Sequence, residues 1–266
     1  MNKQSAANIA TKHTQTRKIP VWLKVIILPL WVIGILFLSQ LIFSNLFRWI
    51  IPQHILTYPW VQSLYIIISD VVALLIIILV PNYLEKKHHI TKKESTRKIL
   101  GLLDLLTWKD ILLSLIGYFV YLFLSYLLFR LFSAFPWFNP DQAQDLGYTY
   151  SLLFGIDKII TMLALIVVVP IVEEVLFRGF LYGKLKRIML STFKKRAELL
   201  SILFSTLIVS LAFALLHGQW NVGVDVFAMS VVLCIMREIS GSIYPGILVH
   251  IIKNTLAFFV LSSLLR

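Results

Sequence analysis

The stretch Glu173-Glu174-Val175-Leu176-Phe177-Arg178 ends an apolar run, Ile159 to Val172, whose composition predicts a membrane span. Each charged side chain at the centre of a spanning helix costs roughly 2.5–3.5 kcal/mol. The three charges together cost on the order of 8–10 kcal/mol, whereas about a dozen Leu, Ile and Val residues return only roughly 4–7 kcal/mol. A helix with this balance is not stable alone in lipid, so the sequence predicts partner side chains or a wet cavity for its charges.

The composition of the chain is that of a polytopic membrane protein. Of its 266 residues, 59% are hydrophobic and 14% are charged, whereas a soluble domain is about half apolar and about a quarter charged. The net charge of +12 would indicate nucleic-acid binding in a soluble protein. Here basic loop residues set the topology and attract anionic lipids, so we expect membrane lipids and no nucleic acid among the partners.

Two local features argue against a secreted, disulfide-bonded protein. The apolar run after Pro20 is too long for a signal-peptide core, so the first span is expected to be retained. The single cysteine, Cys234, lies in an apolar run and is expected to be a buried, unreactive thiol. One cysteine allows neither an internal disulfide nor a cysteine-based zinc site.

Apolar runs of roughly 17–25 residues predict an all-α fold of about seven transmembrane helices, with six or eight as alternatives. The predicted spans are Val21 to Phe47, Val61 to Leu84, Ile111 to Phe132, about Lys158 to Tyr182, Glu198 to His217, about Val222 to Arg237, and Ile243 to Leu265. Between them, Ile99 to Leu106 is amphipathic and predicts an interfacial helix. The aromatic segment Phe135 to Tyr150 predicts an interfacial belt, with a substrate-facing loop as the alternative.

Basic residues indicate the orientation of these spans. They cluster in the N-terminal tail, in the connection after the second span and in the connection from Lys184 to Arg196. The other connections hold few basic residues. By the positive-inside rule, the N-terminus and both basic connections are cytoplasmic. The sequence therefore predicts an integral, multi-pass membrane protein with a cytoplasmic N-terminus.

Later spans supply partners for the charged stretch. The predicted fifth span ends at His217, and the seventh contains His250 and Asn254. Residues four apart share a helix face, so His250 and Asn254 point the same way, and Glu174 is placed to pair with Arg178. Glu173 lies about 100° round the helix from Glu174, which leaves one carboxylate to face a cavity.

A carboxylate, two imidazoles and an amide suit hydrolysis inside a membrane. Glu173 would take a proton from water as general base, and His217 would hold or share that water. His250 and Asn254 would donate hydrogen bonds to the oxyanion that forms on a scissile carbonyl. Alternatively, Glu173, His217 and His250 would bind one zinc ion with an open fourth position. The residues alone leave both mechanisms open.

Structural interpretations compete with these roles. A single intramembrane histidine is more often a packing residue than a catalyst. Asp70 in the second span and Asp225 in the sixth are predicted to join helices through polar contacts. Lys253, beside Asn254, is expected to neutralise a carboxylate or line a cavity, without a catalytic role.

Three spaced motifs favour the catalytic interpretation over the structural one. Glu-Glu-x-x-x-Arg at residues 173–178, Phe-x-x-x-His at residues 213–217 and His-x-x-x-Asn at residues 250–254 follow one another on consecutive hydrophobic segments. In this order they resemble the CPBP family, which contains the CAAX prenyl endopeptidases and the bacterial Abi proteins. The resemblance covers roughly residues 157–260, whereas the first 150 residues match only as generic spans.

The resemblance implies an intramembrane endopeptidase that cuts a membrane-associated protein or peptide, in peptide maturation or in bacteriocin self-immunity. It implies that Glu173 activates water with His217, that Glu174 and Arg178 support the site, and that His250 and Asn254 stabilise the oxyanion. Both a metalloprotease and a glutamate-dependent, metal-free mechanism are argued for the family. It also implies a bacterial plasma membrane. Residues 1–150 would then hold the tail and three spans, and residues 151–266 the catalytic core.

Two other classes of function are kept as alternatives. A non-catalytic binding or immunity protein would sequester a peptide and keep the fold without needing the chemistry. A transporter would also explain intramembrane charges, but the sequence shows no inverted repeat.

If all spans are straight helices, the candidate site residues lie at different depths in the membrane. Glu173 and His250 lie toward the cytoplasmic side, whereas His217 ends an outward-running span that rises about 30 Å. A kink at Pro170, a kink near Pro245 or a partly re-entrant segment at 217–221 is expected to bring the groups together.

Overall fold

The computed structural model describes residues 19–87, 96–102, 105–142, 155–193 and 198–264, and every regular element within them is helical. This confirms the all-α prediction. The elements are α2 (Val21–Ile50), α3 (Gln53–Leu56), α4 (Pro59–Lys87), α5 (Thr96–Leu100), α6 (Trp108–Phe132), α7 (Gly155–Leu163), η2 (Ala164–Val168), α8 (Val169–Glu174), η3 (Val175–Leu181), α9 (Tyr182–Phe193), α10 (Glu198–Leu215), α11 (Trp220–Ser240) and α12 (Tyr244–Leu264).

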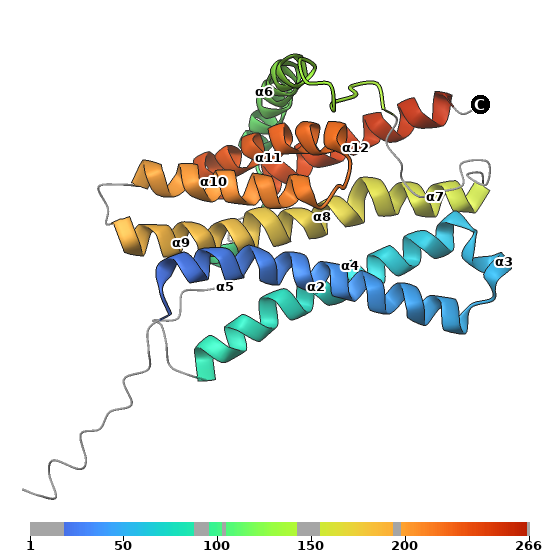
Figure 1. Ribbon diagram of the computed structural model, residues 1–266, viewed down its shortest axis with the longest axis horizontal. Coiled ribbons are helices and arrows are strands. Elements are labelled where there is room, and N and C mark those ends of the chain that lie inside the picture. Colours follow the sequence, from blue (N-terminus) through green and yellow to red (C-terminus); the bar gives the residue numbers. More distant parts are fainter. Residues whose placement is uncertain (1–18, 88–95, 103–104, 143–154, 194–197, 265–266) are drawn as a thin grey trace, which may run out of the picture.

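One long helix runs through the middle of the molecule. It consists of α7, η2, α8, η3 and α9, where η2 and η3 are π-helical segments with wider turns. In Figure 1, α2 and α4 lie on one side of this helix, and α10, α11 and α12 lie on the other. The helix α6 packs against α11 and α12. The charged stretch at residues 173–178 therefore lies at the centre of the bundle.

Each of the seven predicted helices is present in the described residues. Five are long and apolar enough to cross a membrane: Val21–Ile50, Pro59–Leu84, Trp108–Phe132, Gly155–Thr192 and Glu198–Leu215. The described apolar part of α12, Tyr244–Val260, is shorter. Among α10, α11 and α12, the helix α11 is the most enclosed, with more than half of its residues buried. The chain is an integral, multi-pass membrane protein.

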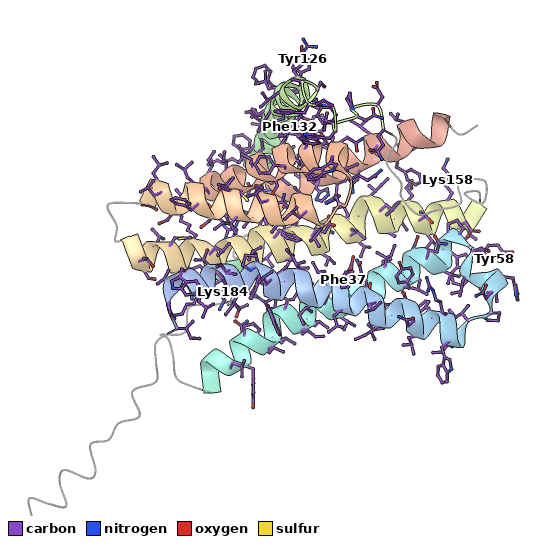
Figure 2. The ribbon with its side chains drawn as sticks, in the orientation of Figure 1. Phe37, Tyr58, Tyr126, Phe132, Lys158 and Lys184 are labelled. Carbon is purple, nitrogen blue, oxygen red and sulfur yellow. The ribbon has the colours of Figure 1, made fainter. Side chains whose placement is uncertain are left out.

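The outward faces of the bundle are apolar, as a lipid environment requires. Phe37 on α2 is 66% exposed and Tyr126 on α6 is 61% exposed. Side chains of this kind cover the outside of the helices in Figure 2. In water such faces would be an aggregation hazard, whereas lipid chains cover them without cost.

Two predicted boundaries are wrong. The fourth helix does not end near Tyr182 but continues through α9 to Phe193, so Lys184 and Lys186 lie on a helix and not in a loop. Tyr182 Oη donates a hydrogen bond of 2.8 Å to Glu238 at the end of α11, and Lys186 forms an ion pair with the same carboxylate. These contacts hold α9 against the bundle, which a hydropathy pattern does not reveal.

The predicted interfacial helix at residues 99–106 is also shorter than expected. The helix α5 ends at Leu100, where Gly101 adopts a left-handed conformation (φ 71°). The buried Ile99 and Leu100 pack against the central helix, and a Cβ on Gly183 would lie 2.6 Å from the Ile99 carbonyl oxygen. The segment is therefore tied to the protein core, and residues 103–104 lie outside the described part.

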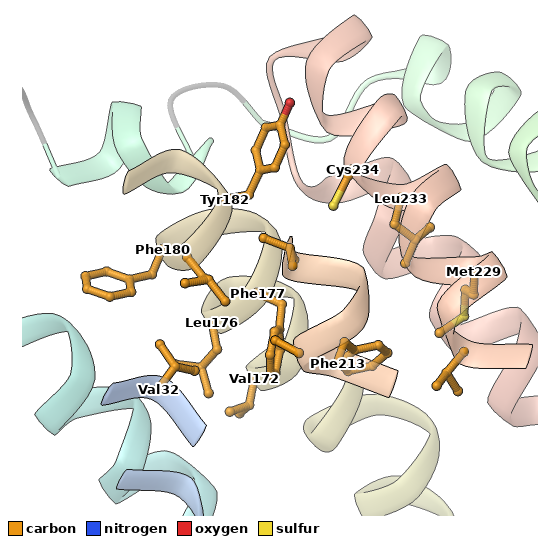
Figure 3. Packing of buried hydrophobic residues seen from close by; sticks show 14 of the residues in the cluster. Val32, Val172, Leu176, Phe177, Phe180, Tyr182, Phe213, Met229, Leu233 and Cys234 are labelled. Atoms are coloured by element: carbon orange, nitrogen blue, oxygen red, sulfur yellow. The ribbon is translucent and has the colours of Figure 1, made fainter. Parts of the chain in front are cut away.

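Buried side chains fill the space between the central helix, α10 and α11. Phe177 and Phe213 meet edge to face, with ring centres 4.9 Å apart. Met229 and Leu233 of α11 are buried in the same cluster, and so is Cys234, as the sequence predicted (Figure 3). This packing fixes the rotation of the helices that carry the three motifs.

Candidate active site

The length of the central helix sets the depth at which His217 lies along the bundle. Arg178 stands fifteen positions before Phe193, the end of α9, and Phe213 stands fifteen positions after Glu198, the start of α10. The two helices run antiparallel, so these side chains reach the same level, and Arg178 Cζ lies 4.5 Å from the centre of the Phe213 ring. The extra turns of α9 thus remove the conflict in depth. The chain then reverses in a short turn between α10 and α11.

Glu174 and Arg178 form the buried ion pair that the sequence predicted. Both residues are fully buried, and Arg178 Nη1 lies 2.8 Å from Glu174 Oε1. The same oxygen lies 3.0 Å from Nδ1 of His250 on α12. Two donors and a cationic partner offset the cost of burying this carboxylate. We call Glu174, Arg178, Phe213 and His250 the inner cluster.

A glycine makes room for the inner cluster. Gly246 precedes His250 by one turn of α12, and a Cβ at this position would lie 3.0 Å from Glu174 Oε2. A larger residue would press on the carboxylate, which is enclosed on all sides and has little freedom to move. Sequence reasoning missed this residue, because a glycine within an apolar run carries no distinctive local signal.

Phe213 contacts both histidines. Its ring centre is 5.0 Å from that of His217 and 6.0 Å from that of His250. The two imidazoles are therefore no further apart than the sum of these distances. The ring also faces the Arg178 guanidinium, a cation–π contact that adds to the stability of a desolvated cation. Phe213 thus joins the second and third motifs in space.

Glu173 occupies a more open position than its neighbour. Its side chain is 26% exposed, and Oε2 lies 3.5 Å from Nε2 of His250. This distance is that of an ion pair and exceeds an ordinary hydrogen bond. Nδ1 of His250 faces the Glu174 carboxylate, which is already paired with Arg178. The contact between His250 Nε2 and Glu173 is therefore favourable when one proton lies on Nε2 or on Glu173. Glu173 and His250 are therefore placed to share a proton.

His217 follows the last turn of α10. Its Nδ1 lies 2.9 Å from the Phe213 carbonyl oxygen. A carbonyl only accepts, so Nδ1 carries the proton, and Nε2 keeps a lone pair that is free to accept a hydrogen bond from water. The side chain is half-buried. We call Glu173 and His217 the outer pair.

Asn254 satisfies a backbone oxygen that the central helix leaves open. In η2, the N–H of Val169 bonds to the carbonyl of Ala164, five residues earlier. The next bond of this pattern would join residue 170 to Leu165, but Pro170 has no N–H. Asn254 replaces this missing donor, because its Nδ2 donates a hydrogen bond of 2.9 Å to the Leu165 carbonyl oxygen. Its second amide hydrogen is not used by this bond.

The two π-helical segments flank the first motif. They occupy Ala164–Val168 and Val175–Leu181, immediately before and after α8. Such segments are rare and are frequently found at functional sites. Here they surround the helix turn that presents Glu173 and Glu174 in different directions.

Asp70 and Asp225 make the predicted contacts between helices. Asp225 accepts hydrogen bonds from Tyr121 Oη (2.8 Å) and Ser125 Oγ (2.7 Å), which joins α11 to α6. Asp70 accepts from Gln40 Nε2 at 3.4 Å, which joins α4 to α2. Lys253 lies near Asp225, as expected for a residue that neutralises a carboxylate.

The predicted zinc ligands do not form a metal site in this arrangement. Among the described residues, no group of three or more His, Cys, Asp or Glu side chains is close enough to hold a metal ion. His250 directs one ring nitrogen to Glu174 and the other to Glu173. The Phe213 ring contacts both His250 and His217. No reaction step is therefore derived through a metal.

An apolar cavity of about 490 Å³ adjoins the turn that follows His217. Gly218 and Gln219 of this turn contribute to its wall, together with apolar side chains of α6, α10 and α11. Trp137 and Trp220 also line it, with ring centres 5.2 Å apart. The cavity is suited to an apolar group. The predicted segment Phe135 to Tyr150 enters this wall through Trp137, and its residues 143–150 lie outside the described part.

Comparison with known families agrees with the motifs. Residues 155–256 match the family described as type II CAAX prenyl endopeptidase Rce1-like, which confirms the resemblance predicted from the three motifs. The matched region contains the inner cluster and the outer pair. Comparisons with curated proteins and with solved structures gave no match.

Proposed function

We propose that this protein is an intramembrane endopeptidase that hydrolyses a peptide bond in a membrane-associated protein or peptide. The observation that carries the proposal is the division between two adjacent carboxylates. Glu174 is fully buried in an ion pair, whereas Glu173 is 26% exposed and faces His250. The family match at residues 155–256 supports a protease of the CAAX type.

The proposed mechanism begins with water between the outer pair. Glu173 takes one proton from the water, and the lone pair of His217 Nε2 orients it. The water oxygen attacks the carbonyl carbon of the scissile bond, and the electron pair of the carbonyl moves to its oxygen. Protonated Glu173 then gives its proton to the amide nitrogen, the C–N bond breaks, and an amine and a carboxylic acid leave.

His250 and Asn254 are proposed to stabilise the oxyanion. His250 Nε2 is the ring nitrogen that faces the outer pair, and it donates when it carries the shared proton. Asn254 has one amide hydrogen that is not used by Leu165 O. Donors of this kind are strong in a water-poor site, where removing one typically costs about 10²–10³ in rate.

We infer the kind of substrate from the cavity beside the site and the orientation from the basic residues. The cavity beside the His217 turn would accept an apolar part of the substrate. Residues 1–18 and the basic segment 184–196 are proposed to be cytoplasmic. The setting we propose is a bacterial plasma membrane, in peptide maturation or bacteriocin self-immunity.

The test is proteolysis by the purified protein in proteoliposomes, with a library of apolar peptides as substrates. Glu173→Gln, His217→Ala and His250→Ala are each expected to abolish cleavage. Cleavage retained by all three variants would reject the site. Because the ligand geometry does not fit zinc, a chelator titration is expected to leave the rate within about twofold, a change smaller than about 0.4 kcal/mol in the barrier.

A second function is favoured by the apolar cavity. A non-catalytic protein that sequesters a peptide needs this cavity but not the chemistry of Glu173. In that case Glu173→Gln would leave the cellular phenotype intact, whereas filling the cavity with Gly223→Phe would abolish it. The reverse result, loss with Glu173→Gln alone, supports the endopeptidase.

A further inference from the structure

Lys253 lies beside the site but belongs to none of its motifs. It follows His250 by three positions on α12 and directly precedes Asn254. Residues three apart are neighbours on a helix surface, so its side chain extends from the same part of α12 as the imidazole. The side chain is 15% exposed. A lysine at this place in the bundle requires an explanation beyond solvation.

The ammonium group has a charge partner but no hydrogen-bond acceptor among the described residues. Its nearest carboxylate oxygen is Asp225 Oδ2, at 3.9 Å, which is too long for a hydrogen bond. Asp225 already accepts from Tyr121 through both of its oxygens and from Ser125 through Oδ1. Asp225 therefore holds Lys253 in place by charge and leaves its three N–H donors unused.

The position of this charge matters for the site. Lys253 is close enough to act electrostatically on Glu173, His217 and His250. An ammonium has three N–H donors and is strongly hydrated in water, so acceptors at this position come from water or from a ligand. A carboxylate is the group that satisfies both its charge and its donors.

We infer that Lys253 binds a carboxylate of the substrate close to the scissile bond. This inference rests on the proposed endopeptidase function and names a feature of its substrate. The carboxylate comes from the C-terminal end of the peptide or from an Asp or Glu side chain, because both present the same group. Each extended residue spans about 3.3–3.6 Å, so the carboxylate lies within a few residues of the bond that is cut.

A purely structural role makes a different prediction. If Lys253 only neutralised Asp225, its replacement would lower stability and would affect all substrates equally. The double variant Asp225→Asn/Lys253→Met would then recover what Lys253→Met loses. If Lys253 binds the substrate, the double variant recovers stability but not substrate preference.

The experiment compares three apolar nonapeptides of otherwise equal sequence. The first ends in a free carboxylate, the second in an amide, and the third in an amide with one glutamate near the cleaved bond. For the wild type, one carboxylate peptide is expected to have a KM about 10- to 100-fold below that of the neutral peptide. Lys253→Met is expected to remove this difference in KM between the charged and the neutral peptides, because the partner of the carboxylate is lost. Lys158→Met, on α7, is the matched control and keeps the difference.

A binding assay tests this inference independently of the proposed endopeptidase function. The affinity of the Glu173→Gln protein for the same peptides is measured by fluorescence anisotropy, which needs no turnover. A carboxylate preference that disappears in Glu173→Gln/Lys253→Met supports the inference even if catalysis fails. Equal affinity for charged and neutral peptides overturns the inference, whereas absence of cleavage by the wild type overturns only the endopeptidase. The first and third peptides distinguish a chain end from an acidic side chain.

Discussion

Glu173 and Glu174 are adjacent in the chain, yet they belong to two different regions of the site. Glu174, in the inner cluster, is fully buried and pairs with Arg178 and His250. Glu173, in the outer pair, is 26% exposed and has its contact with His250 at 3.5 Å. Successive helix residues point about 100° apart, so one turn of helix serves both packing and chemistry. The inner region gives stability, which allows the outer region to keep a less satisfied carboxylate.

The largest expected effect separates the two regions by activity. Glu173→Gln is expected to lower kcat at least about 10³-fold, because it removes the general base. The midpoint of thermal unfolding should stay within about 3 °C, because the side chain is the same size and makes no buried ion pair. Peptide cleavage and a thermal melt in detergent measure the two quantities. Loss of the fold together with activity would place Glu173 in the inner cluster instead.

The second prediction acts on the inner cluster. Arg178→Met leaves Glu174 buried without its cation, which is expected to cost about 3–5 kcal/mol of unfolding free energy. Unfolding in a denaturing detergent measures the loss. Arg130→Met, on the exposed face of α6, is the control and should change stability by less than about 0.5 kcal/mol. An Arg178 variant as stable as this control would show that the buried pair is not needed.

The third prediction tests how closely the inner cluster is packed. Gly246→Ala places a Cβ 3.0 Å from Glu174 Oε2, and we expect a destabilisation of about 1–3 kcal/mol from overpacking. Gly34→Ala is the matched control, since it also lies within a helix but has no atom within 4 Å of the added Cβ. It should stabilise the protein by up to about 1 kcal/mol. Equal effects of the two substitutions would contradict the packing described.

The smallest expected effect concerns Asn254, which we place in both regions. Asn254→Ala leaves the Leu165 carbonyl without its donor and is expected to cost about 1–2 kcal/mol of stability. In a Pro170→Ala background the helix supplies an N–H at residue 170, so the same change should cost about 1 kcal/mol less. Activity should stay low in the double variant if Asn254 also stabilises the oxyanion. Full recovery of activity would assign it a structural role alone.

The sequence by itself determined the parts of the site that depend on helix periodicity. Residues four apart on one helix meet, so the Glu174–Arg178 pair and the shared face of His250 and Asn254 were predicted from spacing. The all-α fold and the multi-pass membrane class followed from hydropathy. The resemblance to the CAAX prenyl endopeptidases was predicted from three motifs in order, and a model of such a family matches residues 155–256.

Only the tertiary structure decided how distant segments meet. The level of His217 depends on the turns from Tyr182 to Phe193, whose basic residues resemble a loop in the sequence but are held as a helix by Glu238. The contacts of Phe213 with two histidines, and the bond from Asn254 to Leu165, depend on the relative rotation of the helices that carry them. Helix length and rotation are set by packing between elements, and local sequence patterns carry no record of such contacts.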